Sequence, residues 1–153
     1  MNKGFTAVEL VVVIFIILLI MAMGTVSFYN SGSAKRLDTI TDGLVFTIEQ
    51  ARSDTLAGKA GRSYGVRFDV GSYTLFTSTT YDSSSTTNKI NILPSGWKLS
   101  TTTQNPAITS IYFRRLTGFP QATTTVQVSN TANPALKRDV VIGSQGNISV
   151  VKY

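Results

Sequence analysis

The sequence predicts an α+β protein in which a long N-terminal helix, membrane-spanning in its first half, packs against an antiparallel β-sheet head. Three patterns in the 153 residues lead to this prediction. Residues 10–29 carry no charged side chain, residues 37–55 repeat apolar positions at intervals of three and four, and residues 64–152 contain short alternating runs. These patterns are typical of an apolar helix, an amphipathic helix and β-strands.

Composition excludes several classes of chemistry. The chain has no cysteine and no histidine, and only 14% of its residues are charged. It therefore has no disulfide, no thiolate nucleophile, no imidazole base and no metal site with cysteine or histidine ligands. The net charge of +6 permits an acidic partner without requiring one.

The apolar run is long enough to cross a bilayer. Twenty helical residues at about 1.5 Å each match a hydrocarbon core of about 30 Å. A helix buried in a soluble core is typically shorter and has a polar face. A secretory signal peptide has a shorter apolar region followed by a small-residue cleavage site, which this segment lacks. We therefore expect residues 5–29 to form a transmembrane helix.

The charged residues on either side of this span leave its orientation open, and one carboxylate lies directly at its edge. Lys3 precedes the span, but Lys35 and Arg36 follow it, so the positive-inside rule does not decide the topology. Glu9 lies next to the apolar run, where a carboxylate is costly and marks a candidate functional site. Alternatively, Glu9 simply lies in the headgroup region.

The residues around Glu9 carry a family resemblance. The N-terminus reads MNKGFTAVEL directly before the span, and this closely resembles the class III signal sequence of type IV pilins and type II secretion pseudopilins. The resemblance implies that residues 1–4 are a leader, that a prepilin peptidase cleaves between Gly4 and Phe5, and that Phe5 is then N-methylated. It also implies that Glu9 neutralises the N-terminal amine of a neighbouring subunit in the filament.

The residue types at positions 4 and 9 are consistent with the roles that the resemblance implies. Glycine at position 4 has no side chain to obstruct a peptidase, and a buried carboxylate is tolerable when a fixed ammonium pairs with it. The implied partners are the prepilin peptidase, other pilin or pseudopilin subunits and the bacterial inner membrane. The implied location is a single-pass inner-membrane protein with its N-terminus cytoplasmic and its head outside the cytoplasm, later a pilus or pseudopilus filament.

An amphipathic continuation of the helix is expected over residues 30–58. Its predicted buried face comprises Leu37, Ile40, Leu44, Ile48, Ala51 and Thr55, and its polar face Asp38, Asp42, Glu49 and Arg52. Gly58 and Gly61 are placed to end the helix. Gly24, Gly32 and Gly43 weaken it, and the resemblance implies local melting during assembly, for which Gly24 is the expected place.

The remaining residues, 62–153, are predicted to form the β-rich head. Residues 64–70 and 72–77, separated by Gly71, are a predicted hairpin. Further predicted strands are residues 89–93, 108–114, 123–128, 138–142 and 148–152, with loops at 77–88 and 100–106. The strand patterns alone favour one largely antiparallel sheet covering the helix.

The order of these segments narrows the resemblance to one group. YGVRFDVGSYTLF, then IYFRRLTGFP, then RDVVIGSQGNISVVKY is similar to the GspH/FimT group of minor pseudopilins and minor pilins. The resemblance implies two sheets after the helix and a closing strand pair around a glycine-containing turn. The absence of cysteine separates the chain from major pilins with a C-terminal disulfide loop.

No catalytic, cofactor or metal site is expected. The hydroxyl clusters at residues 83–85 and 101–103 have no base near them in the sequence, so the chain is not predicted to be an enzyme. Asp82 and Asp139 could join a calcium site, but isolated carboxylates are usually surface charges. The sequon at Asn147 is too short a pattern to carry weight.

Basic residues raise the alternative of DNA binding. Lys137, Arg138 and Lys152 are a candidate DNA-contact cluster near the closing hairpin. Arg114 and Arg115, if they lie in a strand, point to opposite faces. Some FimT-like pilins capture DNA through a Gly-Arg-x-Arg stretch at this turn, where this chain has Gly146-Asn147-Ile148-Ser149, so DNA capture by that route is not favoured.

The expected function is therefore structural. The sequence predicts a minor pilin or pseudopilin subunit, processed by prepilin peptidase, that serves the initiation or tip assembly of a type IV pilus or a type II secretion pseudopilus. Two alternatives stay open. One is a DNA-binding minor pilin for DNA uptake, and the other is an adhesive or major filament subunit with hydroxyl-rich loops.

Overall fold

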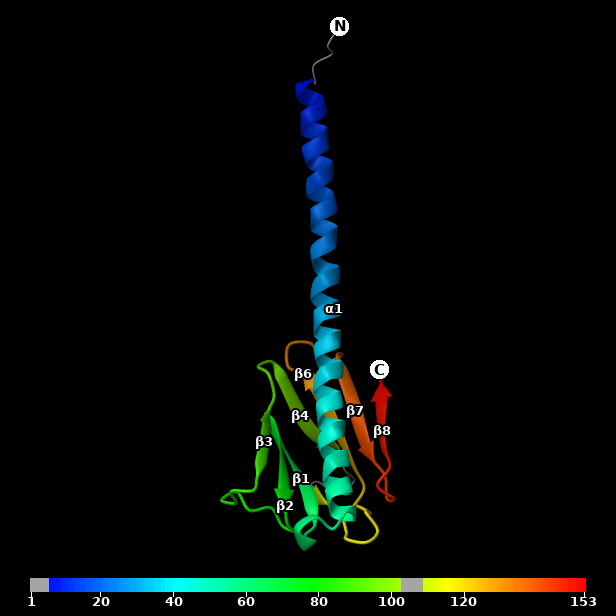
Figure 1. The fold of residues 1–153 in the computed structure, drawn as a ribbon. Helices are drawn as coiled ribbons and strands as arrows, with labels where there is room; N and C mark the ends of the chain where they lie inside the picture. The colour runs from blue at the N-terminus through cyan, green and yellow to red at the C-terminus, as the bar shows by residue number, and fades with distance from the viewer. Residues whose placement is uncertain (1–5, 103–108) are drawn as a thin grey trace. The chain divides into compact units, whose positions relative to one another are not determined.

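The computed structural model describes residues 6–102 and 109–153, with the side chains of all of these except 22–31 and 102. Its contacts divide the chain into two compact units, Met1–Arg36 and Leu37–Tyr153. We call the first the N-terminal unit and the second the head. Helix α1, Ala7–Leu56, contributes residues to both units (Figure 1).

The N-terminal unit is a helix with a defined start. The side chain of Thr6 accepts a hydrogen bond from the backbone N–H of Glu9 at 3.3 Å, and the Thr6 carbonyl accepts one from Leu10 at 3.2 Å. Threonine at this position satisfies one of the N–H groups that have no partner inside the helix. Glu9 lies in the first turn, where a negative charge is favourable to the helix dipole.

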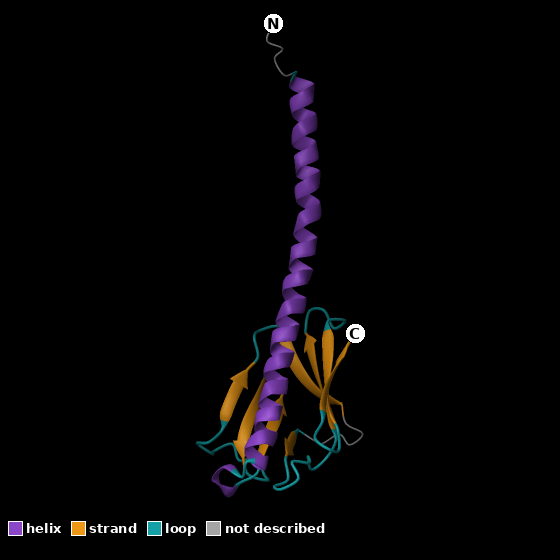
Figure 2. Cartoon of the chain, turned by 45° about the vertical axis from the view of Figure 1, so that its right-hand side comes forward, coloured by secondary structure: helices purple, strands orange, loops and turns teal. Residues whose placement is uncertain are grey.

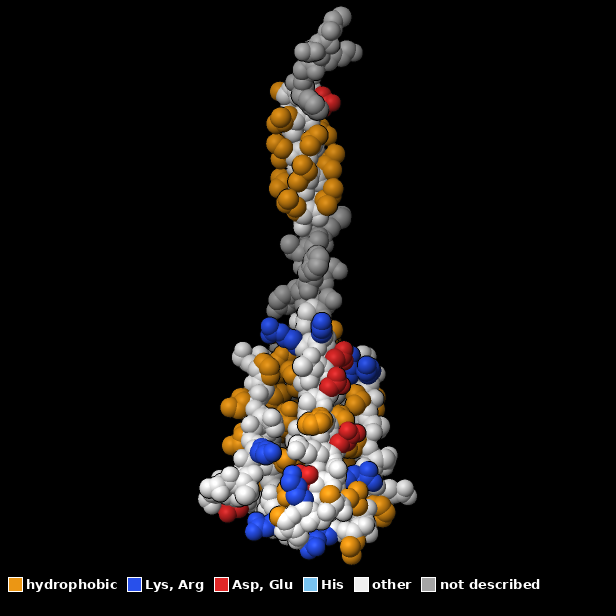
Figure 3. Space-filling view, in the orientation of Figure 1, with side chains coloured by type: hydrophobic (Ala, Val, Ile, Leu, Met, Phe, Trp, Pro, Cys, Tyr) orange, Lys and Arg blue, Asp and Glu red, His pale blue; other side chains and the backbone are white. Residues whose placement is uncertain are grey.

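Large apolar side chains cover this part of the helix. Thirteen of them between positions 8 and 21 are exposed, with exposed fractions from 45% at Val13 to 73% at Val8, and Figure 3 shows them along the face in view. Within the described residues, no helix reaches the length and hydropathy needed to cross a membrane.

In the head, the predicted buried stripe of α1 is confirmed. Leu37, Leu44, Ile48 and Ala51 are completely buried, Thr55 is 1% exposed, and Ile40 packs against the same core. Thr41 joins them, and its hydroxyl donates to the Leu37 carbonyl at 2.8 Å. A buried hydroxyl in a helix is tolerated when it bonds in this way to the preceding turn.

The head contains two four-stranded antiparallel sheets. The first has the order β3-β2-β1-β5, and the second has the order β4-β6-β7-β8. The first sheet comprises β1 (Tyr64–Asp69), β2 (Ser72–Thr77), β3 (Lys89–Ile92) and β5 (Ser110–Tyr112). The second comprises β4 (Trp97–Thr102), β6 (Thr124–Asn130), β7 (Lys137–Ile142) and β8 (Ile148–Lys152).

These sheets confirm the two-sheet architecture implied by the resemblance and correct the single sheet favoured by the strand patterns. The missed strand is β4, because its Ser- and Thr-rich end was assigned to a loop at residues 100–106. Its alternation is nevertheless present: Trp97 and Leu99 are buried, whereas Lys98 and Ser100 are exposed. Strand β5 is also shorter than the predicted 108–114.

One hydrophobic core joins α1 to both sheets. Helix residues Leu44 and Ile48 belong to the same buried cluster as Val66 and Phe113 beside the first sheet and Val140 of the second. Figures 1 and 2 show the C-terminal half of α1 lying across the strands. The helix is therefore part of the core of the head and is required to cover both sheets.

The helix ends at Leu56, just before the glycines expected to end it. Gly58 follows in the left-handed conformation, with φ of 61°, which glycine adopts without steric cost. The Thr55 hydroxyl then accepts a hydrogen bond from the backbone N–H of Tyr64 at 2.9 Å. This contact fixes the start of β1 against the last turn of the helix.

Both predicted hairpins are present. Strands β1 and β2 pair with Asp69 opposite Ser72, across the two-residue turn at Val70 and Gly71. Strands β7 and β8 pair with Ile142 opposite Ile148. The second turn is closed by hydrogen bonds from the Gly143 N–H to Asn147 and from the Gly146 N–H to Gly143, both 2.9 Å.

Candidate functional site

The assembly residues predicted from the sequence lie at the start of the chain. Gly4 and Phe5 are outside the described residues. Glu9 is described, and its side chain is exposed in the first turn of α1. Among the described residues, its carboxylate has no hydrogen-bond donor or cation beside it. Its free acceptor atoms therefore border the apolar surface formed by positions 10–21.

The candidate DNA-contact residues do not form one surface. Arg138 lies 3.4 Å from Asp38 of α1 through its Nη2 atom, with a side chain that is only 13% exposed. Lys137 lies on the other face of β7, since neighbouring side chains in a strand alternate, and its Nζ is 4.6 Å from the ring centre of Tyr153. Lys152 is paired with Arg138 in the β7–β8 register and is exposed.

Two carboxylates considered for calcium binding have local partners. Asp82 accepts hydrogen bonds from the N–H and the hydroxyl of Ser84, at 2.9 and 2.7 Å, and these hold the pKa of its carboxyl below the usual value. Asp139 accepts from Gln127 at 2.9 Å and from the Tyr153 hydroxyl at 2.7 Å. No group of three potential metal ligands occurs within the described parts of the chain.

Neither of the two adjacent arginines lies in a strand, although the predicted strand at residues 108–114 included Arg114. Strand β5 ends at Tyr112, so Arg114 and Arg115 lie in the following turn and both are exposed. The turn is held by hydrogen bonds from the Arg114 N–H to Phe119 at 2.8 Å and from the Gly118 N–H to Arg114 at 2.9 Å. The alternation argument for opposite faces therefore does not apply to them.

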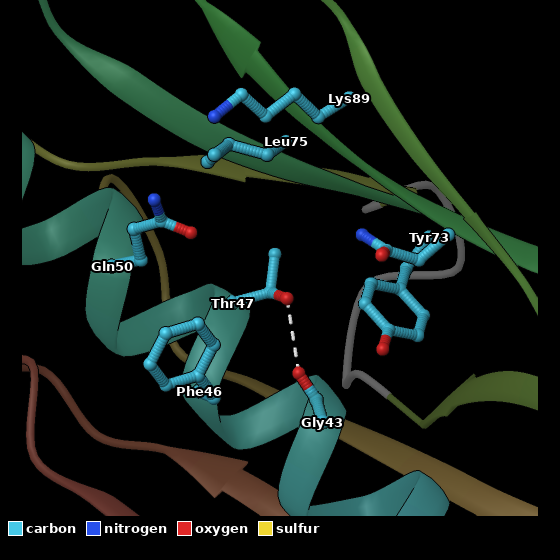
Figure 4. A pocket seen from close by; sticks show the side chains of 8 residues that line it. Gly43, Phe46, Thr47, Gln50, Tyr73, Leu75 and Lys89 are labelled. Atoms are coloured by element: carbon cyan, nitrogen blue, oxygen red, sulfur yellow. Dashed lines mark hydrogen bonds between the residues drawn. The ribbon is translucent and has the colours of Figure 1, made fainter.

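A pocket of about 230 Å³ lies between α1 and the β2–β3 edge of the first sheet (Figure 4). Its lining includes Phe46 and Thr47 of the helix and Tyr73, Leu75 and Lys89 of the strands. Burial raises the pKa of the Tyr73 hydroxyl. Gly43 permits this packing, because an added Cβ would lie 3.0 Å from the tyrosine oxygen.

The hydroxyl clusters have structural partners where they are described. Ser84 bonds Asp82, and the hydroxyls of Ser85 and Thr87 lie 2.9 Å apart. Thr101 lies in β4, and Thr103 lies outside the described residues.

Phe46 was not singled out from the sequence. It lies on α1 off the buried stripe, and its side chain is 67% exposed. Ile90 and Ile92 of β3, which are 61% and 82% exposed, are further apolar side chains on the surface of the head. Helical periodicity could have identified Phe46, because a large aromatic residue outside the buried stripe faces solvent or a partner.

The described residues thus have the fold of the minor pseudopilins and minor pilins. The minor pseudopilin EpsH from the type 2 secretion system of Vibrio cholerae is similar over 76% of this chain and 96% of its own, with 15% identity and a TM-score of 0.58. The type IV minor pilin FimU of Pseudomonas aeruginosa is similar over 80% of this chain and 92% of its own, with 12% identity and a TM-score of 0.53.

A second crystal form of FimU gives the same result, with 11% identity and a TM-score of 0.54. No protein-family model and no curated protein sequence matches this chain. At these identities the likeness concerns the fold. The fold is nevertheless the one that the residues MNKGFTAVEL and the order of segments led us to expect.

Proposed function

We propose that this chain is a minor pilin or pseudopilin subunit that is processed by a prepilin peptidase and assembles into a type IV pilus or a type II secretion pseudopilus. The observation that carries the proposal is the set of thirteen exposed apolar side chains between Val8 and Met21 of α1, which we call the apolar belt. It flanks Glu9, in a chain whose fold is that of EpsH and FimU. A role in initiation or at the filament tip is part of the proposal.

The apolar belt must be shielded from water. Burying one large aliphatic side chain gains about 1.5–3 kcal/mol, so thirteen exposed ones make a bare helix in water very unfavourable. The bilayer supplies that cover before assembly, and the helices of other subunits supply it in the filament. The proposed anchoring segment is residues 5–29, with the head outside the cytoplasm.

Glu9 makes the contact between subunits specific, because its carboxylate requires a cation as partner. A carboxylate moved into an apolar environment without a cation carries a large desolvation penalty, whereas a paired ammonium offsets much of it. The new N-terminal amine of Phe5 on a neighbouring subunit, formed by cleavage after Gly4, is the proposed cation. Glu9 has no such partner among the described residues of its own chain, and this supports pairing between subunits.

Processing is tested by intact mass. Expressed with an active prepilin peptidase, the chain should lose residues 1–4 and gain one methyl group. Gly4→Ala should retain the leader, because a Cβ obstructs the cleavage site. A wild-type chain that keeps its leader beside an active peptidase would show that the resemblance at the N-terminus is misleading.

Assembly is tested separately with Glu9→Ala. This variant should be cleaved normally but should enter sheared filaments at a level reduced about tenfold, as expected for loss of a charge-assisted pair. Glu49→Ala is the matched control, because Glu49 is also an exposed helix carboxylate but lies in the head. Equal incorporation of both variants would exclude the proposed role of Glu9.

Abundance separates a minor subunit from a main one. Quantitative mass spectrometry of sheared filaments and of the membrane fraction should find this chain in traces in the filaments. A chain that dominates the filaments would instead be a major structural subunit. That outcome would overturn the minor-subunit assignment without affecting the assembly chemistry.

A further inference from the structure

Two arginines line one depression at the end of the head where α1 stops. The depression has a volume of about 390 Å³ and is open to solvent. Its lining is Gly61, Arg62, Ser63, Thr77, Ser78, Thr79 and Arg115. Figure 3 shows Lys and Arg side chains gathered at this lower end of the head.

Strand pairing brings these distant residues together. Tyr64 opens β1 and pairs with Thr77 of β2, so Ser63 and Ser78 follow just beyond the ladder. On its other side, the Tyr64 carbonyl accepts a hydrogen bond from Phe113 at 2.9 Å. Arg62 lies two residues before Tyr64, and Arg115 lies two residues after Phe113. Because β1 and β5 are antiparallel, both positions lie beyond the same end of these strands. The fold therefore places the two arginines at the same end of the first sheet, where both line the depression.

Neither positive charge is neutralised within the described residues. Lys59, Arg67 and Arg138 form ion pairs there, whereas Arg62 and Arg115 do not. Asp54, on the last turns of α1, is held by Lys59 at 3.1 Å. No carboxylate lines the depression. Two positive charges on the lining of one depression repel each other, and a bound anion would relieve that repulsion.

The lining is also rich in hydrogen-bond donors. Each guanidinium has five N–H donors and no acceptor. Ser63, Thr77, Ser78 and Thr79 add hydroxyl groups. The Ser78 oxygen accepts a hydrogen bond from the Thr80 N–H at 3.3 Å, so its own O–H is free to donate outward. The combination of two planar forks and several hydroxyls matches a tetrahedral oxyanion, which accepts bonds in several directions.

We propose that the Arg62–Arg115 depression binds a phosphate group. Phosphate is favoured over a carboxylate because its oxygens can accept from both guanidinium groups and from the hydroxyls at once. The volume accommodates a group larger than the phosphate alone, so the phosphate is either free, as an ion or monoester, or part of a sugar-phosphate chain. This site is distinct from Lys137, Arg138 and Lys152, and it does not depend on the assembly role.

The test uses the full-length chain in non-ionic detergent micelles at constant ionic strength. Inorganic phosphate is titrated while the side-chain Nε–Hε resonances of the arginines are followed by NMR. We expect saturable shifts at Arg62 and Arg115. Arg62→Gln and Arg115→Gln should each weaken binding about tenfold, the usual effect of removing a hydrogen bond to a charged group.

Matched controls separate this site from general electrostatic attraction. Arg114→Gln removes the same charge from a neighbouring exposed residue outside the depression and should leave affinity within about twofold. Arg62→Lys keeps the charge but loses the fork, and it should weaken binding as well. Shifts that do not saturate, or an equal loss in Arg114→Gln, would overturn the proposal.

Two further probes identify the source of the phosphate. An abasic sugar-phosphate oligomer that binds more tightly than inorganic phosphate, and still requires both arginines, would indicate a phosphodiester chain. Weaker binding of the oligomer would indicate a free phosphate or a monoester. Glucuronate serves as the carboxylate probe, and tighter binding of glucuronate than of phosphate would overturn the assignment to phosphate.

Discussion

The Nε atom of Arg52 donates a hydrogen bond to the backbone oxygen of Gly118 at 3.2 Å. Through its Nη2 atom, the same guanidinium reaches the carbonyl of Gln145 at 3.4 Å. One helix residue therefore ties together the turn after β5 and the turn between β7 and β8. Helical periodicity predicts Arg52 on the polar face of the helix, and in the structure its half-buried guanidinium binds two loops of the head.

Arg52→Met should destabilise the head by about 1–3 kcal/mol, because it removes the donor from two backbone carbonyls while keeping an apolar stem. The measurement is denaturant unfolding of the full-length chain in micelles. Arg114→Met, which removes an exposed arginine without such contacts, is the control. Equal stability of the Arg52→Met and Arg114→Met variants would show that the two carbonyls are satisfied equally well by water.

Gly146→Ala should be destabilising by about 1–3 kcal/mol for two reasons. Gly146 has φ of +77°, and an added Cβ would lie 2.7 Å from both Arg52 Nε and the Gly118 oxygen. Alanine disfavours that backbone conformation. Gly71→Ala is the control, because nothing lies within 4 Å of its added Cβ. Thermal unfolding of both variants should rank them clearly, and the reverse order would contradict the crowding seen here.

Thr55→Val should cost about 1–3 kcal/mol, since it leaves the buried N–H of Tyr64 without its acceptor at 2.9 Å. Thr41→Val is a matched substitution at another buried position. The Thr41 hydroxyl only adds a bond to a helix carbonyl, so its loss should cost less. Hydrogen exchange at the Tyr64 amide would report the effect directly. Unchanged protection in the Thr55→Val variant would show that the Thr55 hydroxyl does not hold the start of β1.

The pKa of Tyr153 should lie above its ordinary value, and replacing Asp139 should remove that shift. Its hydroxyl donates to Asp139 at 2.7 Å, and this hydrogen bond, with the nearby negative charge, raises the pKa of the phenol above 10.0. A raised pKa favours the neutral phenol, so the contact persists below about pH 10 and is lost as the pH rises through the folded-state pKa. Asp139→Asn should lower the pKa measured by NMR at Tyr153. An unchanged value would exclude Asp139 as the cause.

The parts of the fold that follow from local periodicity were predictable. Leu44, Ile48 and Ala51 repeat with helical spacing, and the β1–β2 hairpin alternates around Gly71, so neither depends on distant contacts. Strand β4 was missed because its hydroxyl-rich end resembles a loop, although Trp97 and Leu99 alternate correctly. Threonine favours strands, and pairing with β6 extends the strand through Thr102.

The candidate sites were less predictable, because they depend on which face or edge receives a side chain. Strand alternation already places Lys137 and Arg138 on opposite faces of β7, whereas Arg138 and Lys152 are cross-strand partners. Arg62 and Arg115 are far apart in the chain, and only the β1–β5 pairing brings them together. Strand β5 has only three residues and is followed by a turn. The sequence pattern therefore does not show that Arg115 lies near Arg62.

The shared core of the head sets a minimum for any fragment of this protein. Because Leu37, Leu44, Ile48 and Ala51 are completely buried against both sheets, a recombinant fragment beginning at residue 62 would leave the inner faces of the sheets uncovered and prone to aggregate. A fragment beginning near residue 35 would retain that cover. Limited proteolysis should accordingly stop short of Leu37, and the surviving piece is the part suited to crystallisation and to antibody production.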